Sequence, residues 1–265
     1  MTAIAVIPAR FASTRLPGKP LLRETGRPLI QHVVENARRC GGLSRVVVAT
    51  DDRRIHDAVL AFGGESVMTG EHPNGTSRIA EVVEKLGLGE APHVHAGLHS
   101  RAEPLIVNLQ GDEPELSPAV VDALVAAMEA DAACPMGTVA TPFGPGEDPA
   151  NPNVVKAVLD QRGRALYFSR ACVPFIRDAE PSAPGPQPYL KHLGLYAYRP
   201  SFLRTYVTLR ATPHEQAEKL EQLRALEHGH AIRVIVAPAG SCPHQGIDTP
   251  EQYAAFVGRW RARGS

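Results

Sequence analysis

Short runs of aliphatic and β-branched residues alternate along the first half of the chain with longer segments in which apolar positions recur every three to four residues. The apolar runs are Ile4–Ile7, Arg45–Ala49, Leu105–Leu109 and Gly137–Ala140. The segments with helical periodicity are Leu29–Arg39, Arg53–Phe62, Thr76–Leu86 and Pro118–Glu129. This alternation is typical of βαβ units around a parallel sheet that is buried on both faces. The pattern therefore predicts an α/β fold with a doubly wound, mainly parallel sheet.

The regular alternation of strand and helix patterns ends at about residue 150. We expect further strands at Val154–Leu159, Ala165–Phe168, Leu193–Tyr198 and Ile232–Ala237. We expect helices at Pro213–Glu227 and Pro250–Arg263, and an exposed loop in the proline-rich segment Asp178–Pro188. The layout predicts one domain over residues 1–265, with an inserted sub-region at about residues 162–230.

Composition narrows the possible partners and compartment. Lys plus Arg and Asp plus Glu each number 28, so the formal net charge is zero and the basic excess of a nucleic-acid-binding protein is missing. Neither a signal peptide nor an apolar run of membrane-spanning length is recognisable. The cysteines lie far apart with no C-x-x-C pair, which favours free thiols over a zinc site or a disulfide framework: Cys40, Cys134, Cys172 and Cys242. We predict a cytoplasmic protein that binds no nucleic acid and no membrane.

A basic loop follows the first predicted strand. It contains Arg10, Arg15 and Lys19 and no acidic residue. The first strand–helix loop of an open α/β sheet is the usual phosphate site, and Arg grips phosphate oxygens in a bidentate fashion. Neither a Walker A sequence nor G-x-G-x-x-G is present. The loop therefore indicates a site for a small polyphosphate, the alternative being a solvated surface loop.

Two aspartates far apart in sequence are candidate metal ligands. Asp112 follows the predicted strand Leu105–Leu109 after a glycine turn. Asp248 precedes the last predicted helix, where Thr249 and Gln252 suit a capping box and leave the Asp248 carboxylate free. Magnesium is usually held by one or two carboxylates together with substrate phosphates. Either residue could instead be an ordinary turn or helix-start aspartate, and their spacing does not show that they meet.

Taken together, these segments resemble the 3-deoxy-manno-octulosonate (Kdo) cytidylyltransferase family, the CMP-Kdo synthetases, over nearly the whole chain. The resemblance is carried, in family order, by Ile7–Pro20, Asn108–Pro114, Tyr167–Arg170, His192–Tyr196, Leu220–Arg224 and Ile247–Glu251. The related CMP-sialate synthetases would share only the opening loop.

The resemblance implies a fold like that of nucleotide-diphospho-sugar transferases, Mg²⁺ as cofactor, CTP and Kdo as substrates, a product used in lipopolysaccharide synthesis, and a homodimer formed through the later sub-region. It implies that catalysis depends on Arg10, Arg15, Lys19, Asp112 and Asp248, with the metal on Asp112 and Asp248. The nucleotide would be bound by Pro8, Ala9, Arg10, Lys19, Asn74, Gly75, Arg78 and Gln110, within a cytosine pocket formed by residues 72–78. The sugar acid would be bound by Gln110, Arg170, His192, Tyr196, Glu221 and Gln222.

Several of these residues have ordinary structural explanations as well. Arg170 could be a surface cation, His192 a core histidine, and Tyr196 part of the sheet packing. Glu221 and Gln222 could be solvated residues on the outer face of their helix.

One departure from the family concerns the base: Ser77 stands where the family usually has an acidic residue. We interpret Thr76 as the N-cap of its helix, which places Ser77 in the first turn.

The predicted reaction is an in-line displacement in which the anomeric hydroxyl of the sugar acid attacks the α-phosphorus of CTP. Two alternatives remain. One is a cytidylyltransferase for another acidic sugar, such as an 8-amino Kdo variant or a sialate-like acid. The other is a non-catalytic nucleotide-sugar sensor.

Overall fold

The computed structural model describes residues 3–12, 15–88, 103–177, 188–242 and 246–263. The strands are β1 (Ala3–Ala9), β2 (Leu43–Thr50), β3 (Glu65–Met68), β4 (Ile106–Asn108), β5 (Met136–Pro142), β6 (Lys156–Leu159), β7 (Ala165–Ser169), β8 (Leu190–Tyr198) and β9 (Ile232–Val236). The helices are α1 (Leu29–Ala37), α2 (Arg53–Ala61), α3 (Gly75–Lys85), α4 (Pro118–Ala130), α5 (Pro200–Thr208), α6 (Pro213–Glu218), α7 (Gln222–Glu227) and α8 (Pro250–Arg263), with a short 3₁₀ turn, η1, at Lys19–Leu21.

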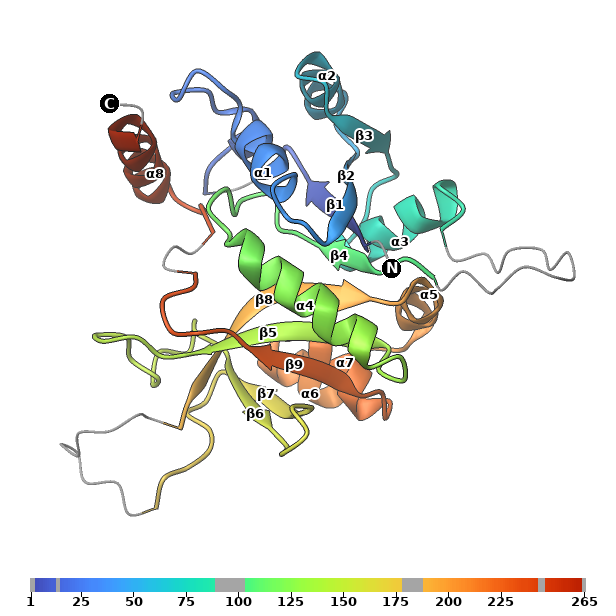
Figure 1. The fold of residues 1–265 in the computed structure, drawn as a ribbon, viewed down its shortest axis with the longest axis vertical. Helices are drawn as coiled ribbons and strands as arrows, with labels where there is room; N and C mark the ends of the chain where they lie inside the picture. Colours follow the sequence, from blue (N-terminus) through green and yellow to red (C-terminus); the bar gives the residue numbers. More distant parts are fainter. Residues whose placement is uncertain (1–2, 13–14, 89–102, 178–187, 243–245, 264–265) are drawn as a thin grey trace, which may run out of the picture.

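One mixed sheet runs through the molecule in the order β3-β2-β1-β4-β8-β5-β9, and β6 pairs with both β7 and β8 (Figure 1). Strands β3, β2, β1 and β4 are parallel, as are β5 and β9. Strand β8 is antiparallel to β4, β5 and β6. The predicted α/β sheet is confirmed, and β8, which lies within the predicted sub-region, is a central strand of it.

Successive residues of each strand point to opposite faces of the sheet, and both faces are buried under helices. In β1, Ala5 and Ile7 pack in one apolar cluster with residues of α1, α2 and α4. Val6 packs in a second cluster with residues of α3, α5 and α7. Because apolar side chains cover both sides, helices must lie on both faces, which is the doubly wound arrangement. The carboxyl ends of the parallel strands consequently meet at one edge, where ligands bind in such sheets.

The predicted helix at Pro213–Glu227 was wrong, because it is two helices. Lys219 has a φ of 54°, in the left-handed region, and separates α6 from α7. The break coincides with tertiary contacts of the residue before it: the Glu218 carboxylate accepts from Ser169 Oγ at 2.6 Å and from the Arg170 N–H at 2.9 Å. A local apolar pattern carries no information about contacts of this kind, which override helix propensity.

Besides the short turn η1, two elements were not predicted from the pattern. Strand β3 has only four residues, all half-buried, and α5 begins with Pro200 directly after β8. The predicted loop at 178–188 lies almost entirely outside the described residues.

In the described parts of the chain, no helix combines the length and apolar character needed to cross a bilayer.

Candidate active site

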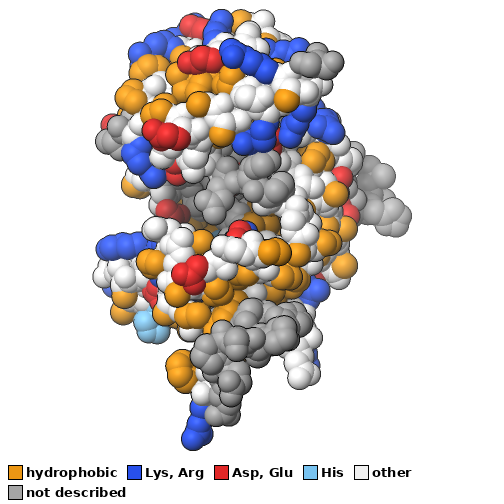
Figure 2. Space-filling model, turned by 90° about the vertical axis from the view of Figure 1, so that its left-hand side faces the viewer, with side chains coloured by type: hydrophobic (Ala, Val, Ile, Leu, Met, Phe, Trp, Pro, Cys, Tyr) orange, Lys and Arg blue, Asp and Glu red, His pale blue; other side chains and the backbone are white. Residues whose placement is uncertain are grey.

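A cavity of about 780 Å³ opens at the edge of the sheet where β1 and β4 end. From the side, the molecule is hollowed between a part rich in Lys and Arg side chains and a part with a broad hydrophobic surface (Figure 2). The cavity is lined by Pro8, Ala9, Arg10, Ala12, Arg15, Lys19, Pro20, His72, Pro73, Asn74, Gly75, Arg78, Gln110, Gly111, Asp112, Glu221 and Asp248. The whole predicted nucleotide-binding and catalytic set therefore lies around one space.

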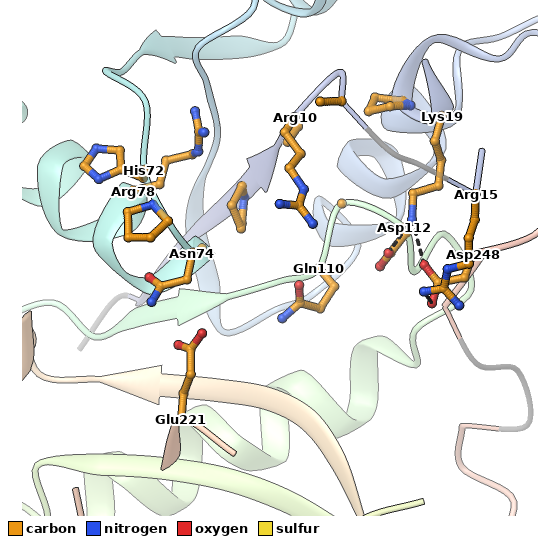
Figure 3. A pocket seen from close by; sticks show the side chains of 17 residues that line it. Arg10, Arg15, Lys19, His72, Asn74, Arg78, Gln110, Asp112, Glu221 and Asp248 are labelled. Atoms are coloured by element: carbon orange, nitrogen blue, oxygen red, sulfur yellow. Dashed lines mark hydrogen bonds and ion pairs between the residues drawn. The ribbon is translucent and has the colours of Figure 1, made fainter. Parts of the chain in front are cut away.

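The basic loop reaches the cavity because it folds back on itself after β1. The Gly18 N–H donates to the Phe11 carbonyl at 3.2 Å. Gly18 has a φ of 67°, and a Cβ atom there would lie only 3.2 Å from the Phe11 ring, so the position favours glycine. The turn starts η1 and brings Lys19 beside Arg10 and Arg15, which project toward the same space (Figure 3).

Asp112 and Asp248 converge on Lys19. Its Nζ donates to Asp112 Oδ2 at 2.7 Å and to Asp248 Oδ1 at 3.1 Å, while Arg15 donates to Asp248 Oδ2 at 3.0 Å (Figure 3). Two carboxylates separated by roughly half the chain thus face one another across a single ammonium group. The structure therefore brings together the two aspartates, whose meeting the sequence spacing could not show.

Close backbone packing and a helix cap place the two carboxylates. A Cβ atom on Gly111 would lie 2.9 Å from the Pro8 carbonyl oxygen, so glycine is needed where β4 leaves the sheet beside β1. At the other aspartate, the Gln252 side chain accepts from the Thr249 N–H at 3.0 Å, and Thr249 Oγ1 accepts from the Gln252 N–H at 3.3 Å. This is the predicted capping box, and it leaves the Asp248 side chain directed at the cavity.

The donor set suits magnesium better than a transition metal. Among the described residues, no three His, Cys, Asp or Glu side chains group together as a ready-made metal cage. Magnesium needs no such cage, because one or two carboxylates, water and substrate phosphates complete its octahedron. Glu113, next to Asp112, borders a small crevice with Val33 and Leu109. Burial and the charge of Asp112 raise the pKa of Glu113 to about 8, so it does not add a third ionised ligand at neutral pH.

The predicted base-binding segment forms the other end of the cavity. His72, Asn74, Gly75 and Arg78 all line it. Our interpretation of Thr76 as the N-cap of α3 was wrong: Asn74 is the cap, and its Oδ1 accepts from the Ser77 N–H at 2.9 Å. Asn caps a helix as well as Thr does, so the sequence alone did not distinguish the two positions.

Arg78 is held by residues that the sequence analysis did not single out. Its guanidinium is buried and donates to Asp51 Oδ2 at 2.7 Å and to Thr69 Oγ1 at 2.7 Å. Asp51 directly follows β2, so the rule that ligand sites lie at the carboxyl ends of parallel strands would have identified it. The two partners fix the plane of the guanidinium at the edge of the cavity.

Glu221 approaches from the opposite side of the cavity, facing Asn74 and Gln110 (Figure 3). It precedes α7, its Oε2 accepts from Thr76 Oγ1 at 3.2 Å, and its carbonyl accepts from the Tyr206 hydroxyl at 2.7 Å. Burial raises the pKa of the Glu221 carboxyl, and the Thr76 hydrogen bond opposes the shift only in part. Of the predicted sugar-binding residues, only Glu221 and Gln110 belong to the described lining of the cavity.

The other four predicted sugar-binding residues lie outside the cavity lining. Arg170 points at backbone: its Nε donates to the Glu218 carbonyl at 2.7 Å and one of its amino groups donates to the Pro152 carbonyl at 3.0 Å. In this structure it therefore holds the end of β7 against α6. Its role toward the sugar stays a prediction, as do those of His192, Tyr196 and Gln222.

His192 and Tyr196 lie on β8, beside the strand end that carries Gln110. Gln110 donates to the Gly194 carbonyl at 3.5 Å. His192 Nε2 lies 2.9 Å from Thr138 Oγ1, and the ring packs against Phe168 and Tyr196. Burial lowers the pKa of His192 to about 4, so the imidazole is neutral at pH 7.

Gln222 is buried at the start of α7, and its amide nitrogen has no hydrogen-bond partner among the described residues. An unpaired buried donor is costly, at about 1–3 kcal/mol. A ligand that accepts from this amide would remove that cost.

Comparisons with known proteins agree with this geometry. Residues 4–232 match the cytidylyltransferase family. The chain is 48% identical over 258 residues to a 3-deoxy-manno-octulosonate cytidylyltransferase of Syntrophobacter fumaroxidans, covering 97% of this chain and 96% of the relative. It is 47% identical over 256 residues to the protein of the same name from Syntrophotalea carbinolica, covering 95% of each.

Solved structures extend the similarity to the fold. A CMP:2-keto-3-deoxy-manno-octonic acid synthetase complexed with CTP superimposes with a TM-score of 0.85 at 40% identity, over 99% of this chain and 100% of that one. A cytidylyltransferase from Leptospira borgpetersenii shares the fold alone, with a TM-score of 0.58 at 16% identity over 97% of this chain and 86% of that one. The chain therefore belongs to the 3-deoxy-manno-octulosonate cytidylyltransferase family.

Proposed function

We propose that this protein transfers CMP from CTP to the anomeric hydroxyl of Kdo, giving CMP-Kdo and pyrophosphate. The observation that carries the proposal is the meeting of Asp112, Asp248 and Lys19 inside a cavity that Arg10 and Arg15 also line. A triphosphate that carries a divalent ion needs carboxylates that hold the ion and cations that hold the phosphates, in one place.

The basic loop would hold the triphosphate. Arg10 and Arg15 offer planar forks that match phosphate oxygens, and Lys19 offers a mobile point charge on a flexible stem. Lys19 can exchange its two carboxylate partners for phosphate oxygens by rotating that stem. These cations would neutralise the charge that develops on the departing pyrophosphate.

Asp112 and Asp248 would hold magnesium, because both offer hard carboxylate oxygens and Lys19 shows that they face a common point. When bound, the ion would neutralise phosphate charge and lower the pKa of the attacking hydroxyl.

Positioning would supply most of the remaining catalysis. Asn74, Gly75 and Arg78 would hold the cytosine end of CTP, with Arg78 fixed by Asp51 and Thr69. Gln110 and Glu221 face one another across the cavity, where they would orient the sugar acid (Figure 3). The anomeric hydroxyl then gives its proton to water, its oxygen forms a bond to the α-phosphorus, the bond from that phosphorus to the bridging oxygen breaks, and pyrophosphate leaves with the electron pair.

Pyrophosphate release tests the proposal directly. We expect the protein mixed with CTP, Kdo and Mg²⁺ to release pyrophosphate and form CMP-Kdo, and to do neither when EDTA removes the metal. Release that is no faster than in the metal-free blank would exclude this reaction.

A panel of substrates tests the alternatives. An 8-amino Kdo variant and a sialic acid, each offered with CTP and UTP, would reveal a different acceptor or base as a higher kcat/KM. Tight CTP binding without turnover on any acceptor would favour a nucleotide-sugar sensor.

We also propose a homodimer formed through the later sub-region. Leu166 on β7 and Phe175 after it lie in this sub-region and are 61% and 85% exposed, and a partner chain would cover both apolar side chains. Light scattering should give twice the 28.4 kDa of one chain, and Phe175→Asp should reduce that mass to one chain. A single-chain mass for the unaltered protein would exclude the dimer. Cytoplasmic location and a role in lipopolysaccharide synthesis stay predictions.

A further inference from the structure

Helix α8 carries Asp248 at its start, yet it packs apart from the two main apolar clusters. Its buried residues Tyr253, Phe256 and Val257 form a separate small cluster with Leu16, Leu29 and Ile247. In Figure 1 the helix lies at the margin of the molecule, beside α1 and away from the sheet. The sheet that places Asp112 therefore does not by itself place Asp248.

Glu115 connects the two aspartate segments. It lies three residues after Asp112, and its side chain is only 8% exposed. Its Oε2 accepts from Arg259 at 2.5 and 3.1 Å, and its Oε1 accepts from Arg263 at 2.9 Å. The two arginines are one helical turn apart on α8, so a single carboxylate holds one face of the helix.

A second attachment lies beside the aspartates themselves. The Ile247 N–H donates to the Asp112 carbonyl at 2.9 Å. A Cβ atom on Gly246 would lie 3.2 Å from Asp112 Oδ1, so the two segments touch at this point.

Helix α8 is also held by its apolar cluster with Leu16 and Leu29 and by the Tyr253 hydroxyl, which accepts from the Glu24 N–H at 3.1 Å. None of these contacts involves the segment that carries Asp112. The Glu115 contacts tie the later turns of α8 to that segment, and so they set the direction of the helix relative to Asp112.

We propose that Glu115 is a positioning residue that keeps the Asp248 carboxylate opposite Asp112, acting through Arg259 and Arg263. The inference rests on the proposed function, because it assumes that the two aspartates share the metal. A small misplacement of a ligand changes a rate strongly even where the ion pair itself contributes little to stability.

Glu115→Gln is the main variant, since it keeps the shape of the side chain and removes its charge. We expect kcat to fall about tenfold while KM for Kdo is unchanged. Arg263→Met, which removes only the more exposed contact, should give a smaller loss. Tyr253→Phe is the matched control: it removes the contact between the Tyr253 hydroxyl and the Glu24 N–H on another side of α8 and should leave kcat unchanged.

Binding of Mn²⁺ in the presence of CTP, followed by electron paramagnetic resonance, gives a readout that does not depend on turnover. Glu115→Gln should weaken it about tenfold and Tyr253→Phe should not. Unchanged Mn²⁺ binding in Glu115→Gln would overturn the proposal.

A double-mutant cycle separates positioning from general destabilisation. In the Asp248→Asn background, Glu115→Gln should cause no further loss of kcat, because the group that it positions is already gone. An equal loss in both backgrounds would overturn the inference. If Asp248→Asn alone leaves turnover and Mn²⁺ binding intact, the metal assignment fails instead, independently of Glu115.

Discussion

The polar side chains on the two sides of the site differ in their charge. On the side of β1 and β4, charged side chains pair with one another, as Lys19 does with Asp112 and Asp248. On the side of β8, His192 and Tyr196 lie behind the cavity lining and are neutral at pH 7: burial lowers the pKa of His192 to about 4 and raises that of Tyr196 well above its usual value.

The difference matches the two substrates of the proposed reaction. A triphosphate with a divalent ion needs fixed charges that exchange partners when it binds. Sugar hydroxyls need neutral donors and acceptors, because a buried unpaired charge on that side would cost far more than a hydrogen bond returns. The predictions below test each side in turn.

The largest effect should come from the charged side. Asp112→Asn should lower kcat about 10³-fold, because it removes a charged ligand of the metal while keeping the side-chain shape. The side chain is 28% exposed, so the free energy of unfolding should change by about 1 kcal/mol or less. Steady-state kinetics measures the loss of kcat, and urea unfolding measures the change in the free energy of unfolding. A large loss of stability with turnover intact would contradict the assignment.

His192 should give the neutral side a pH dependence of stability. Its pKa is near 6.5 in the unfolded chain and about 4 in the folded protein, so the unfolded chain binds more protons between these values. The free energy of unfolding should therefore fall as the pH falls from about 6.5 to 4. Between pH 7 and pH 5 this residue should contribute about 2 kcal/mol.

Urea unfolding at pH 7 and pH 5 measures that contribution. His192→Gln should reduce the difference between the two pH values relative to the unaltered chain. An identical difference in both proteins would show that His192 titrates normally when folded.

Thr138 should set the orientation of the His192 ring. Its hydroxyl donates to the Leu195 carbonyl at 2.7 Å, which leaves a lone pair to accept from His192 Nε2 and makes Nδ1 the acceptor nitrogen. Thr138→Val should raise KM for Kdo about tenfold and leave KM for CTP unchanged.

Thr141→Val is the matched control, since Thr141 is buried on the same strand but donates to the Pro238 carbonyl. It should lower stability without affecting KM for either substrate. A rise in KM for CTP in Thr138→Val would show that the two sides are not separate.

The smallest effect is expected at the base end of the cavity. Ser77 lies in the first turn of α3 but does not line the cavity. Ser77→Glu should change the free energy of unfolding by about 0.5 kcal/mol through the helix dipole. The preference for CTP over UTP should stay the same, as measured by the two kcat/KM values. A shift of the preference would mean that the charge reaches the base.

Local pattern predicted most of the elements because each is encoded over consecutive residues. All eight strands expected from the apolar runs are present, and the capping box at Thr249 and Gln252 forms as its spacing indicates. Strand β3 was missed because four residues are too few to show the alternation of apolar and polar positions. The end of α6 at Lys219 was missed because it coincides with a contact between Glu218 and β7.

The sequence by itself determined the α/β class, the basic loop after the first strand and the identity of both aspartates. Only the tertiary structure decided that Asp112 and Asp248 meet at Lys19, that Asp51 and Thr69 hold Arg78, and that Arg170 contacts backbone. Periodicity reports which face of an element is buried. It does not report which distant side chain that face meets, because the pairing of strands and the direction of α8 set those distances.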